Sequence, residues 1–334
     1  MTPISVFVYR GSLKESQHKA LVLVKDVLNN SLISTNNESQ LIYPRSAIKI
    51  FQALPFINSN AHNLFNLSQE NIAISCSSHI GELMHIAIIQ KWLDKISISE
   101  DTLRCGVHNP KDEQSSNNLF LTGKRPSQLH NNCSGKHLGM ISGCLAMNMG
   151  INNYIDYDHP YQKLIRDSLE VFMETKIKEN CIGTDGCSAP QYAFPMNNIA
   201  TSMVNLAKTI KLKNEYSQAT KIILESINRF PFLIGGTNRF DSNVIKSTKG
   251  RIFCKGGAEG VLLFSDFSKK IGGVIKVIDG NNRAIPSIAM QLFSKLNMLN
   301  EKETKELNHW KVQNIYNHAK TQVGKIVAEV FQIK

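Results

Sequence analysis

The sequence predicts an α+β protein in which both ends of the chain build one antiparallel sheet and the middle forms a mostly helical lobe. Three observations predict this fold: strand patterns open the chain, helical spacing dominates its middle, and strand patterns return near its end. Such segregation is typical of α+β folds. We expect a sheet lobe from residues 1–55 and 235–334 and a helical lobe from 56–234, which together form one compact catalytic unit with its site in the cleft between them.

The first strands and the first helix are indicated by residue types and spacing. Residues 4–9 alternate apolar and small side chains, and residues 20–24 are rich in β-branched ones. Helical spacing begins after Pro44, a residue favoured at the first helical position. By the same criteria the later helices are expected at 80–95, 134–149, 161–176, 191–211, 215–228 and 284–297, and the later strands at 251–255, 260–265, 271–278 and 324–331.

Composition and charge exclude several classes of protein. An apolar content of 42% in 334 residues suffices for a large core, so a disordered protein is excluded. The net charge of +11 is scattered rather than gathered in runs, which predicts no nucleic-acid partner. The chain has neither a 20-residue apolar stretch nor a basic and apolar leader, so we expect a cytoplasmic protein without a membrane partner. Seven cysteines without a leader predict free thiols.

Ser46 and Lys49 form a Ser-x-x-Lys pattern just inside a predicted helix start. Residues three apart share a helical face, so the hydroxyl and the amine can meet there. A lysine with an ordinary pKa of about 10.4 is protonated near pH 7, so a lysine that acts as a base needs a pKa lowered by roughly 3 units. The pattern predicts a nucleophile and its base. The alternative is an N-capping serine followed by a solvated lysine.

Two other segments favour the catalytic interpretation. Ser78 lies in a Ser-Ser-His run ahead of a helix, and Lys255 precedes two glycines at the end of a late strand. A Ser-x-x-Lys, a second serine from the helical lobe and a Lys-Gly pair on a strand resemble the three-part layout of penicillin-recognising serine hydrolases. In that layout the late lysine is a cation facing the cleft. The alternative for Lys255 is an ordinary turn between two strands.

Two runs of small and polar residues, 130–137 and 184–190, lie directly before predicted helices and are suited to present side chains rather than to bury them. Their side chains include ligand types from which a zinc shell could be assembled, namely those of His130, Cys133, His137, Asp185 and Cys187. No pair has Cys-x-x-Cys spacing. Spacing alone therefore leaves open the alternative of buried free cysteines at helix starts.

A longer set of motifs runs through the chain in order. It comprises Arg10-Gly11, Glu15-Ser16 and His18, Tyr43-Pro44-Arg45-Ser46-Ala47, Phe51-Gln52-Ala53-Leu54-Pro55, Ser78-His79 with Gly81-Glu82, His130-Asn131-Asn132-Cys133-Ser134-Gly135-Lys136-His137, Asp185-Gly186-Cys187, Lys255-Gly256-Gly257-Ala258-Glu259-Gly260 and Asp279-Gly280-Asn281-Asn282-Arg283-Ala284. This ordered set resembles the Rhizobium etli-type L-asparaginase II family. No single motif would suffice for the resemblance.

The resemblance implies hydrolysis of L-asparagine to L-aspartate and ammonia, on a fold similar to serine β-lactamases and serine-dependent glutaminases. It also implies a homodimer without a nucleotide or organic cofactor. By motif, it implies two catalytic Ser-Lys pairs, Ser46 with Lys49 and Ser78 with Lys255.

The resemblance further implies one zinc ion per chain, held by Cys133, Lys136 and Cys187. A lysine ligand must be neutral, so the metal would have to lower its pKa. For the substrate, Arg45 is expected to hold the α-carboxylate and Asp185 the α-ammonium. The remaining residues expected to bind substrate are His137 and Glu259.

Two alternatives remain at the level of sequence. An amidohydrolase acting on glutamine or another small amide would keep the same serines and lysines. A non-catalytic zinc-dependent binding protein would keep the cysteines but would gain nothing from the paired serines and lysines. Release of ammonia from asparagine would exclude the second alternative.

Overall fold

The structure, a computed structural model, describes residues 2–209 and 215–330 of the chain. Its contacts divide the chain into two compact units. Unit 1 comprises Met1–Ala47, Phe194–Lys208 and Asn243–Lys334, and unit 2 comprises Ile48–Ala193 and Thr209–Ser242. Unit 1 also takes 194–208, because Phe194 and Pro195 pair with Ile42 and Leu41 of this unit and the helix that follows packs against its sheet at Gly272.

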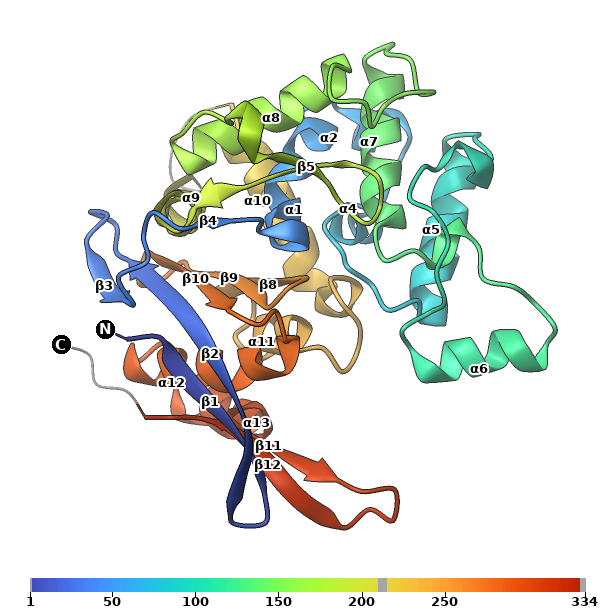
Figure 1. Cartoon of the computed structure of the whole chain (residues 1–334). Helices are drawn as coiled ribbons and strands as arrows, with labels where there is room; N and C mark the ends of the chain where they lie inside the picture. The colour runs from blue at the N-terminus through green and yellow to red at the C-terminus, as the bar shows by residue number, and fades with distance from the viewer. Residues whose placement is uncertain (1, 210–214, 331–334) are drawn as a thin grey trace. The chain divides into compact units, whose positions relative to one another are not determined.

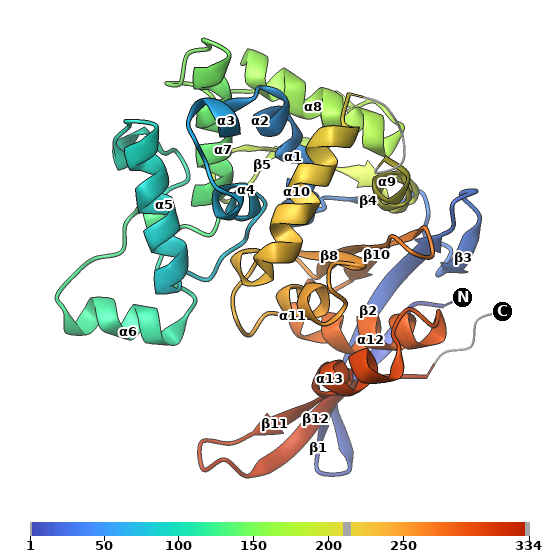
Figure 2. The ribbon, with the colours of Figure 1, turned by 180° about the vertical axis from the view of Figure 1, so that it is seen from behind.

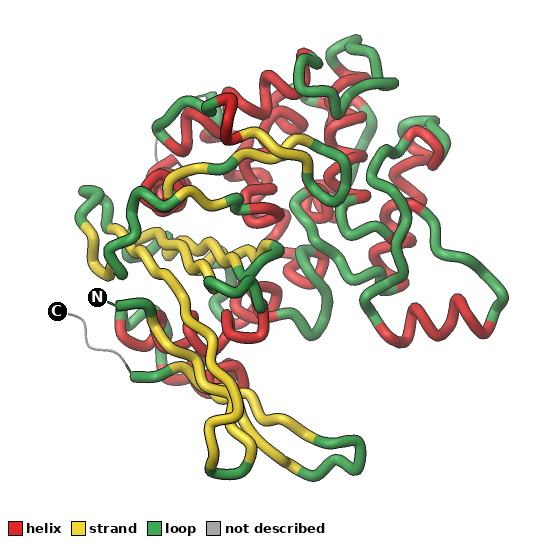
Figure 3. Tube along the Cα trace, in the orientation of Figure 1, coloured by secondary structure: helices red, strands yellow, loops and turns green. Residues whose placement is uncertain are grey.

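Unit 1 is built on one antiparallel sheet, which confirms the α+β class and the contribution of both chain ends. The strand order is β11-β12-β1-β2-β10-β9-β8, with β3 paired to β2. Figure 3 shows these strands as one twisted sheet. Their bounds are β1 (Ile4–Arg10), β2 (Leu13–Lys25), β3 (Ser31–Ser34), β8 (Ile252–Gly257), β9 (Val261–Asp266), β10 (Ile271–Val277), β11 (Val312–Tyr316) and β12 (Gln322–Ala328).

The two chain ends meet at β1, which pairs with β12 on one side and with β2 on the other. Val6 lies opposite both Ala328 and His18, and Ile4 lies opposite Ala20. The even-numbered apolar residues of β1 are buried, as expected for a strand that presents one face to a core. The alternation of apolar and small side chains in residues 4–9 therefore corresponds to the strand β1.

Helices cover the sheet of unit 1. From behind, α12 (Ile285–Lys295) and α13 (Glu301–Lys311) lie over the strands of the chain ends (Figure 2). The helix α9 (Met196–Thr209) holds β2 through Lys25, whose amine donates to Asn197 and Thr201 at 2.9 Å each. The helix expected over 191–211 begins only at Met196 because the preceding residues form short strands.

One short helix and two short strands complete the elements around unit 1. The strand β4 (Leu41–Ile42) pairs with β7 (Phe194–Pro195), which ties the chain ahead of Pro44 to the start of α9. The helix α11 (Phe240–Ser247) leads into β8. The pairing of β4 with β7 explains why residues 194–208, which lie far from the other parts of unit 1 in the sequence, belong to this unit.

Unit 2 is mainly helical, as Figure 1 shows. Its elements are α1 (Lys49–Gln52), α2 (Leu54–Asn58), α3 (Ala61–Leu64), α4 (Gln69–Ser75), α5 (Leu83–Lys95), α6 (Glu113–Leu121), α7 (Ser134–Ala146), α8 (Pro160–Met173), α10 (Ser217–Arg229) and a hairpin of β5 (Ile182–Thr184) and β6 (Pro190–Tyr192). The helix α7 is buried from Ser134 to Cys144. Among the described residues, none of the helices is both long and apolar enough to cross a membrane.

Alanine at position 272 is expected to destabilise unit 1. A Cβ on Gly272 would lie 2.4 Å from backbone atoms of Met203 and Val204, so α9 would have to move away from β10. We expect a loss of about 1–3 kcal/mol in the free energy of unfolding, measured by urea denaturation. The control Gly150→Ala, where an added Cβ meets no atom within 4 Å, should change it by less than about 0.5 kcal/mol. Equal stability of the two variants would contradict the prediction.

Candidate active site

Ser46 lies in a short 3₁₀ helix, Arg45–Ile48, which runs directly into α1 at Lys49. Arg45 has a φ of 54°, a left-handed conformation that is uncommon for a residue with a side chain. Such strained residues cluster at functional sites. Ser46 itself is half-buried, so its side chain is not part of the fully buried core.

The strand that carries Lys255 packs against the turn that carries Ser46. A Cβ on Gly257 would lie 2.5 Å from the carbonyl oxygen of Pro44 and 3.3 Å from the amide nitrogen of Ala47, so only glycine allows this approach. Lys255 is two residues earlier on β8 and therefore points to the same face of the strand as position 257. The structure thus brings the Lys255 strand and the Ser46 turn together within unit 1.

Lys49 is fully buried in unit 2, at 0% exposure, so the alternative of a solvated lysine is wrong. Its amine donates to the backbone oxygen of Ser77, to Ser78 Oγ at 3.2 Å and to Cys133 Sγ at 3.2 Å. These three partners hold the amine in a fixed position. Lys49 therefore contacts Ser78, a pairing that the sequence did not indicate.

Ser78 is held in place by its neighbours on both sides. Its backbone N–H donates to the carbonyl oxygen of Ile234 at 2.8 Å. The next residue, His79, bonds through Nε2 to Ser134 Oγ at 2.9 Å, and because Ser134 itself donates to Leu129, the histidine is the donor. Burial, together with the nearby His85, lowers the pKa of His79 well below its usual value, so this anchor is neutral. Sequence reasoning missed His79 as a site residue, although it directly follows Ser78.

Cys133, Lys136 and Cys187 come together in unit 2. Cys133 is the residue before α7, Lys136 lies in the first turn of that helix, and Cys187 lies in the connection of the β5–β6 hairpin. The Lys136 amine donates to Cys187 Sγ at 3.0 Å. Each of the three side chains is at most 4% exposed. The two runs of small residues thus meet, as the predicted site requires.

The charges in this cluster are coupled. The hydrogen bond from Cys133 and, against the effect of burial, the Lys136 ammonium hold the pKa of Cys187 well below its usual value. The same hydrogen bond and burial raise the pKa of Cys133. Burial alone would lower the pKa of Lys136, but the thiolate of Cys187, Cys133 and the carboxylate of Asp185 raise it instead. Without a metal ion the cluster is therefore a thiolate–ammonium pair beside a neutral thiol.

This donor set fits zinc in its chemistry. Two sulfurs and an amine, buried and adjacent, are ligands that a borderline-soft ion accepts, although the amine must first lose its proton. Among the described residues, no three His, Cys, Asp or Glu side chains gather closely enough to hold a metal ion. The predicted set contains only two such side chains, so any site here depends on the lysine.

The four residues expected to bind substrate divide between the units. In unit 2, His137 Nδ1 hydrogen-bonds with Tyr154 at 2.6 Å, and its Nε2 is buried without a hydrogen-bond partner among the described residues. Half-buried Asp185 accepts from the Gly186 N–H at 2.8 Å. In unit 1, Arg45 precedes Ser46. Glu259, also in unit 1, is exposed with a φ of 60° in the turn between β8 and β9.

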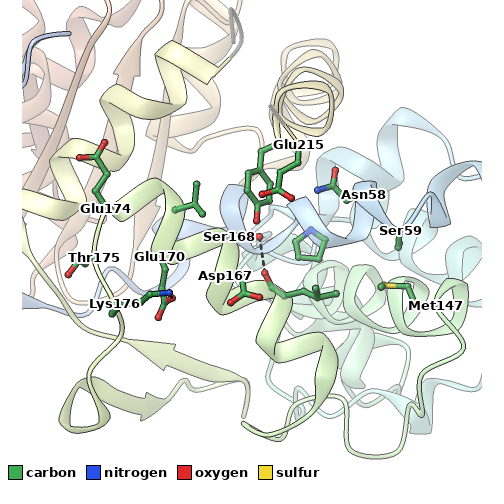
Figure 4. A pocket seen from close by; sticks show the side chains of 14 residues that line it. Asn58, Ser59, Met147, Asp167, Ser168, Glu170, Glu174, Thr175, Lys176 and Glu215 are labelled. Atoms are coloured by element: carbon green, nitrogen blue, oxygen red, sulfur yellow. Dashed lines mark hydrogen bonds and ion pairs between the residues drawn. The ribbon is translucent and has the colours of Figure 1, made fainter. Parts of the chain in front are cut away.

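A cavity of about 750 Å³ lies elsewhere in unit 2, between α8 and the start of α10. Figure 4 shows the carboxylates of Asp167, Glu170, Glu174 and Glu215 around it. None of the predicted site residues lines this cavity. Its acidic side chains therefore have no part in the site described above.

Comparisons with known proteins give a family and a likeness to solved structures. A family model described as L-asparaginase II matches residues 6–328. No curated protein matches the chain. Among solved structures, the one named "putative beta-lactamase from Bacteroides dorei DSM 17855" aligns with a TM-score of 0.39 at 10% identity, over 91% of this chain and 93% of that chain. The description of the fold therefore rests on the topology of this chain itself.

Proposed function

This chain belongs to the L-asparaginase II family, and from that premise we propose that it hydrolyses the side-chain amide of L-asparagine to L-aspartate and ammonia. Membership of the family supports an amide hydrolase with a small-molecule substrate. The observation that carries the catalytic assignment is the buried Lys49, which contacts Ser78 and lies one residue beyond the 3₁₀ helix of Ser46.

The proposed mechanism is acyl transfer through Ser46. Its Oγ attacks the amide carbon while Lys49 takes the hydroxyl proton. The backbone N–H groups at the start of the Ser46 helix stabilise the oxyanion of the tetrahedral intermediate. The C–N bond then breaks, and the nitrogen leaves as ammonia with the proton returned by the lysine. Water attacks the resulting ester by the same route and releases aspartate.

Ser78 and Lys255 are assigned to proton relay and to polarisation of the amide. The hydrogen bond between Lys49 and Ser78 supports the relay, because a neutral amine with two N–H groups would keep one lone pair to exchange a proton with that hydroxyl. The packing of Gly257 on the Ser46 turn supports the role of Lys255, because it places the strand of that lysine beside the nucleophile.

Binding of the substrate is assigned to charged and polar side chains of both units. Arg45 would hold the α-carboxylate through a fork-shaped contact, and Asp185 would hold the α-ammonium. His137 and Glu259 would complete the contacts. The homodimer, the cytoplasmic location and the absence of a nucleic-acid partner stay predictions.

Cys133, Lys136 and Cys187 would hold one zinc ion. Bound there, the ion would supply positive charge and would tie the β5–β6 hairpin to the start of α7. Lys136 has to lose its proton to bind zinc. Asp185 and His137 both interact electrostatically with Lys136, so the loss of its positive charge would act on both side chains.

Ammonia release from a panel of amides tests the proposal. The purified chain is incubated with L-asparagine, L-glutamine and a simple aliphatic amide, and ammonia is measured by a coupled assay. We expect release from L-asparagine at the highest kcat/KM. Preference for L-glutamine would overturn the substrate assignment and favour a glutaminase, and no release from any amide would overturn the proposed activity altogether.

A further inference from the structure

The loop that carries Ser78 is supported by a second segment of unit 2, residues 232–237, which we call the brace. The N–H of Ser78 donates to the carbonyl oxygen of Ile234 at 2.8 Å, and the N–H of Ile80 donates to that of Gly235 at 3.1 Å. Ile234 is fully buried, at 0% exposure. The position of Ser78 therefore depends on where the brace is held.

Two side chains that follow Ser78 in the sequence fasten the brace at its two ends. Glu82 Oε1 accepts two hydrogen bonds from Thr237, one from Oγ1 at 2.6 Å and one from the backbone N–H at 3.3 Å. His85 Nε2 lies 3.2 Å from the carbonyl oxygen of Phe232, and because a carbonyl can only accept, this nitrogen carries the hydrogen. Both side chains lie at the start of α5, so one helix holds both ends of the brace.

The loop and the brace pack closely at Glu82. Gly236 has a φ of 144°, and a Cβ there would lie 2.6 Å from Ile80 Cδ1 and 3.4 Å from Glu82 Oε2. Gly81 has a φ of 81°, and a Cβ there would lie 2.9 Å from the Cβ of Pro110. Glycine is the residue that adopts such backbone conformations without strain. The Glu82 carboxylate is therefore set between two segments that leave it little freedom.

The second carboxylate oxygen of Glu82 shows what the clasp requires. Oε2 is buried without a hydrogen-bond partner among the described residues and lies 3.7 Å from His85 Nδ1, which is buried and unpartnered too. Burial lowers the pKa of His85, so its ring is neutral and turns a lone pair toward this oxygen. The clasp thus uses Glu82 as an acceptor through Oε1. A glutamine would keep that acceptor and would offer an N–H to His85.

We propose that Glu82 is a positioning residue for Ser78 and acts on it through the brace. The inference rests on the proposed function, in which Ser78 is assigned to proton relay with Lys49. Lys49 donates both to Ser78 Oγ and to the backbone oxygen of Ser77, so a shift of this loop changes the path of the proton. Misplacement of a catalytic group by about 1 Å can slow a reaction by about 100-fold. Loss of the clasp should therefore lower kcat and leave KM nearly unchanged.

Kinetics of paired variants test this role. Glu82→Ala should lower kcat for ammonia release from L-asparagine by about 10–100-fold, and Thr237→Val by a smaller factor because its N–H still donates. Glu82→Gln and Thr237→Ser keep the acceptor and the hydroxyl, so each should stay within about threefold of the unaltered protein. The double variant should be no slower than Glu82→Ala, because both changes remove the same bond. Losses that multiply, a Glu82→Gln as slow as Glu82→Ala, or a change confined to KM would overturn the proposal.

Hydrogen exchange tests the brace without turnover. The amides of Ser78 and Ile80 donate to the brace, so Glu82→Ala should speed their exchange by about tenfold or more and leave the peptides of α7 unchanged. The matched control is Glu113→Ala, which removes an exposed carboxylate in the first turn of α6 and should leave exchange at Ser78 as it is.

The two measurements separate the inference from the function on which it rests. Unchanged exchange at Ser78, or faster exchange throughout unit 2, would overturn the positioning role of Glu82. Faster exchange at Ser78 in a protein that releases no ammonia from any amide would refute the proposed function, whereas the clasp on the brace would stand. Should Glu82→Ala fail to fold, Thr237→Val, which changes an exposed side chain, carries the same test.

Discussion

Replacement of Ser46 by alanine is expected to lower kcat for ammonia release from L-asparagine by at least about 10³-fold, the range found when a catalytic nucleophile is removed. Alanine lacks the Oγ that attacks the amide carbon, so no ester forms. The fold should persist, because the side chain is half-buried in a 3₁₀ turn and the change removes a single oxygen atom. The measurements are steady-state kinetics and urea denaturation of the variant beside the unaltered protein.

The variant Ser78→Ala decides between the two serines. Ser78 is the hydroxyl that Lys49 contacts, at 3.2 Å, so it is the strongest competitor for the role of nucleophile. If it only relays protons, Ser78→Ala should retain measurably more activity than Ser46→Ala. With a slowly hydrolysed amide or ester, rapid quenching and mass spectrometry should find the aspartyl group on Ser46. An acyl group on Ser78, or a larger loss in Ser78→Ala, would exchange the two assignments.

The sheet could be predicted from the sequence because its strands carry local signals. Alternation in β1 and apolar runs in β9 and β10 follow directly from which face of each strand is buried. The helix α6 could not be predicted in the same way. Its residues are polar on most sides and Phe120 is 85% exposed, so no apolar stripe marks it. Its start depends instead on Asp112, which caps the helix by accepting from the Ser115 N–H at 2.8 Å.

The contacts of the candidate site could likewise be predicted only where they join residues close together in the sequence. The spacing of Ser46 and Lys49 is local, so it could be read directly from the chain. The contacts of Lys49 with Ser78 and Cys133 join residues 29 and 84 positions apart, and no spacing rule covers such distances. The small residues are a partial exception. Gly257 in a strand signals a close approach of backbone, and the structure places the Ser46 turn against it.

The second large effect is expected in the zinc content of the protein when Cys187 is replaced. The purified protein, prepared without chelators, is expected to contain about one zinc per chain, and Cys187→Ala is expected to contain close to none, as measured by elemental analysis. Loss of Cys187 leaves two assigned ligands, too few for a buried site. The control Cys181→Ala lies just before the same hairpin and is buried, but it is not assigned to the metal, so it should keep its zinc. Equal zinc in both variants would remove Cys187 from the site.

The dependence of zinc affinity on pH tests the unusual ligand. In the structure without a metal, the pKa values of Lys136 and Cys133 are both raised, the first by the neighbouring Cys187 thiolate against the effect of burial and the second by its hydrogen bond to Cys187. Zinc must therefore displace two protons, while Cys187 is already deprotonated. Each displaced proton makes binding about tenfold tighter per pH unit, so the affinity should rise about 100-fold per unit between pH 6 and 8. A rise of only about tenfold per unit would mean that the amine keeps its proton and does not bind the ion. The variant Lys136→Met, left with two assigned ligands, should bind close to no zinc.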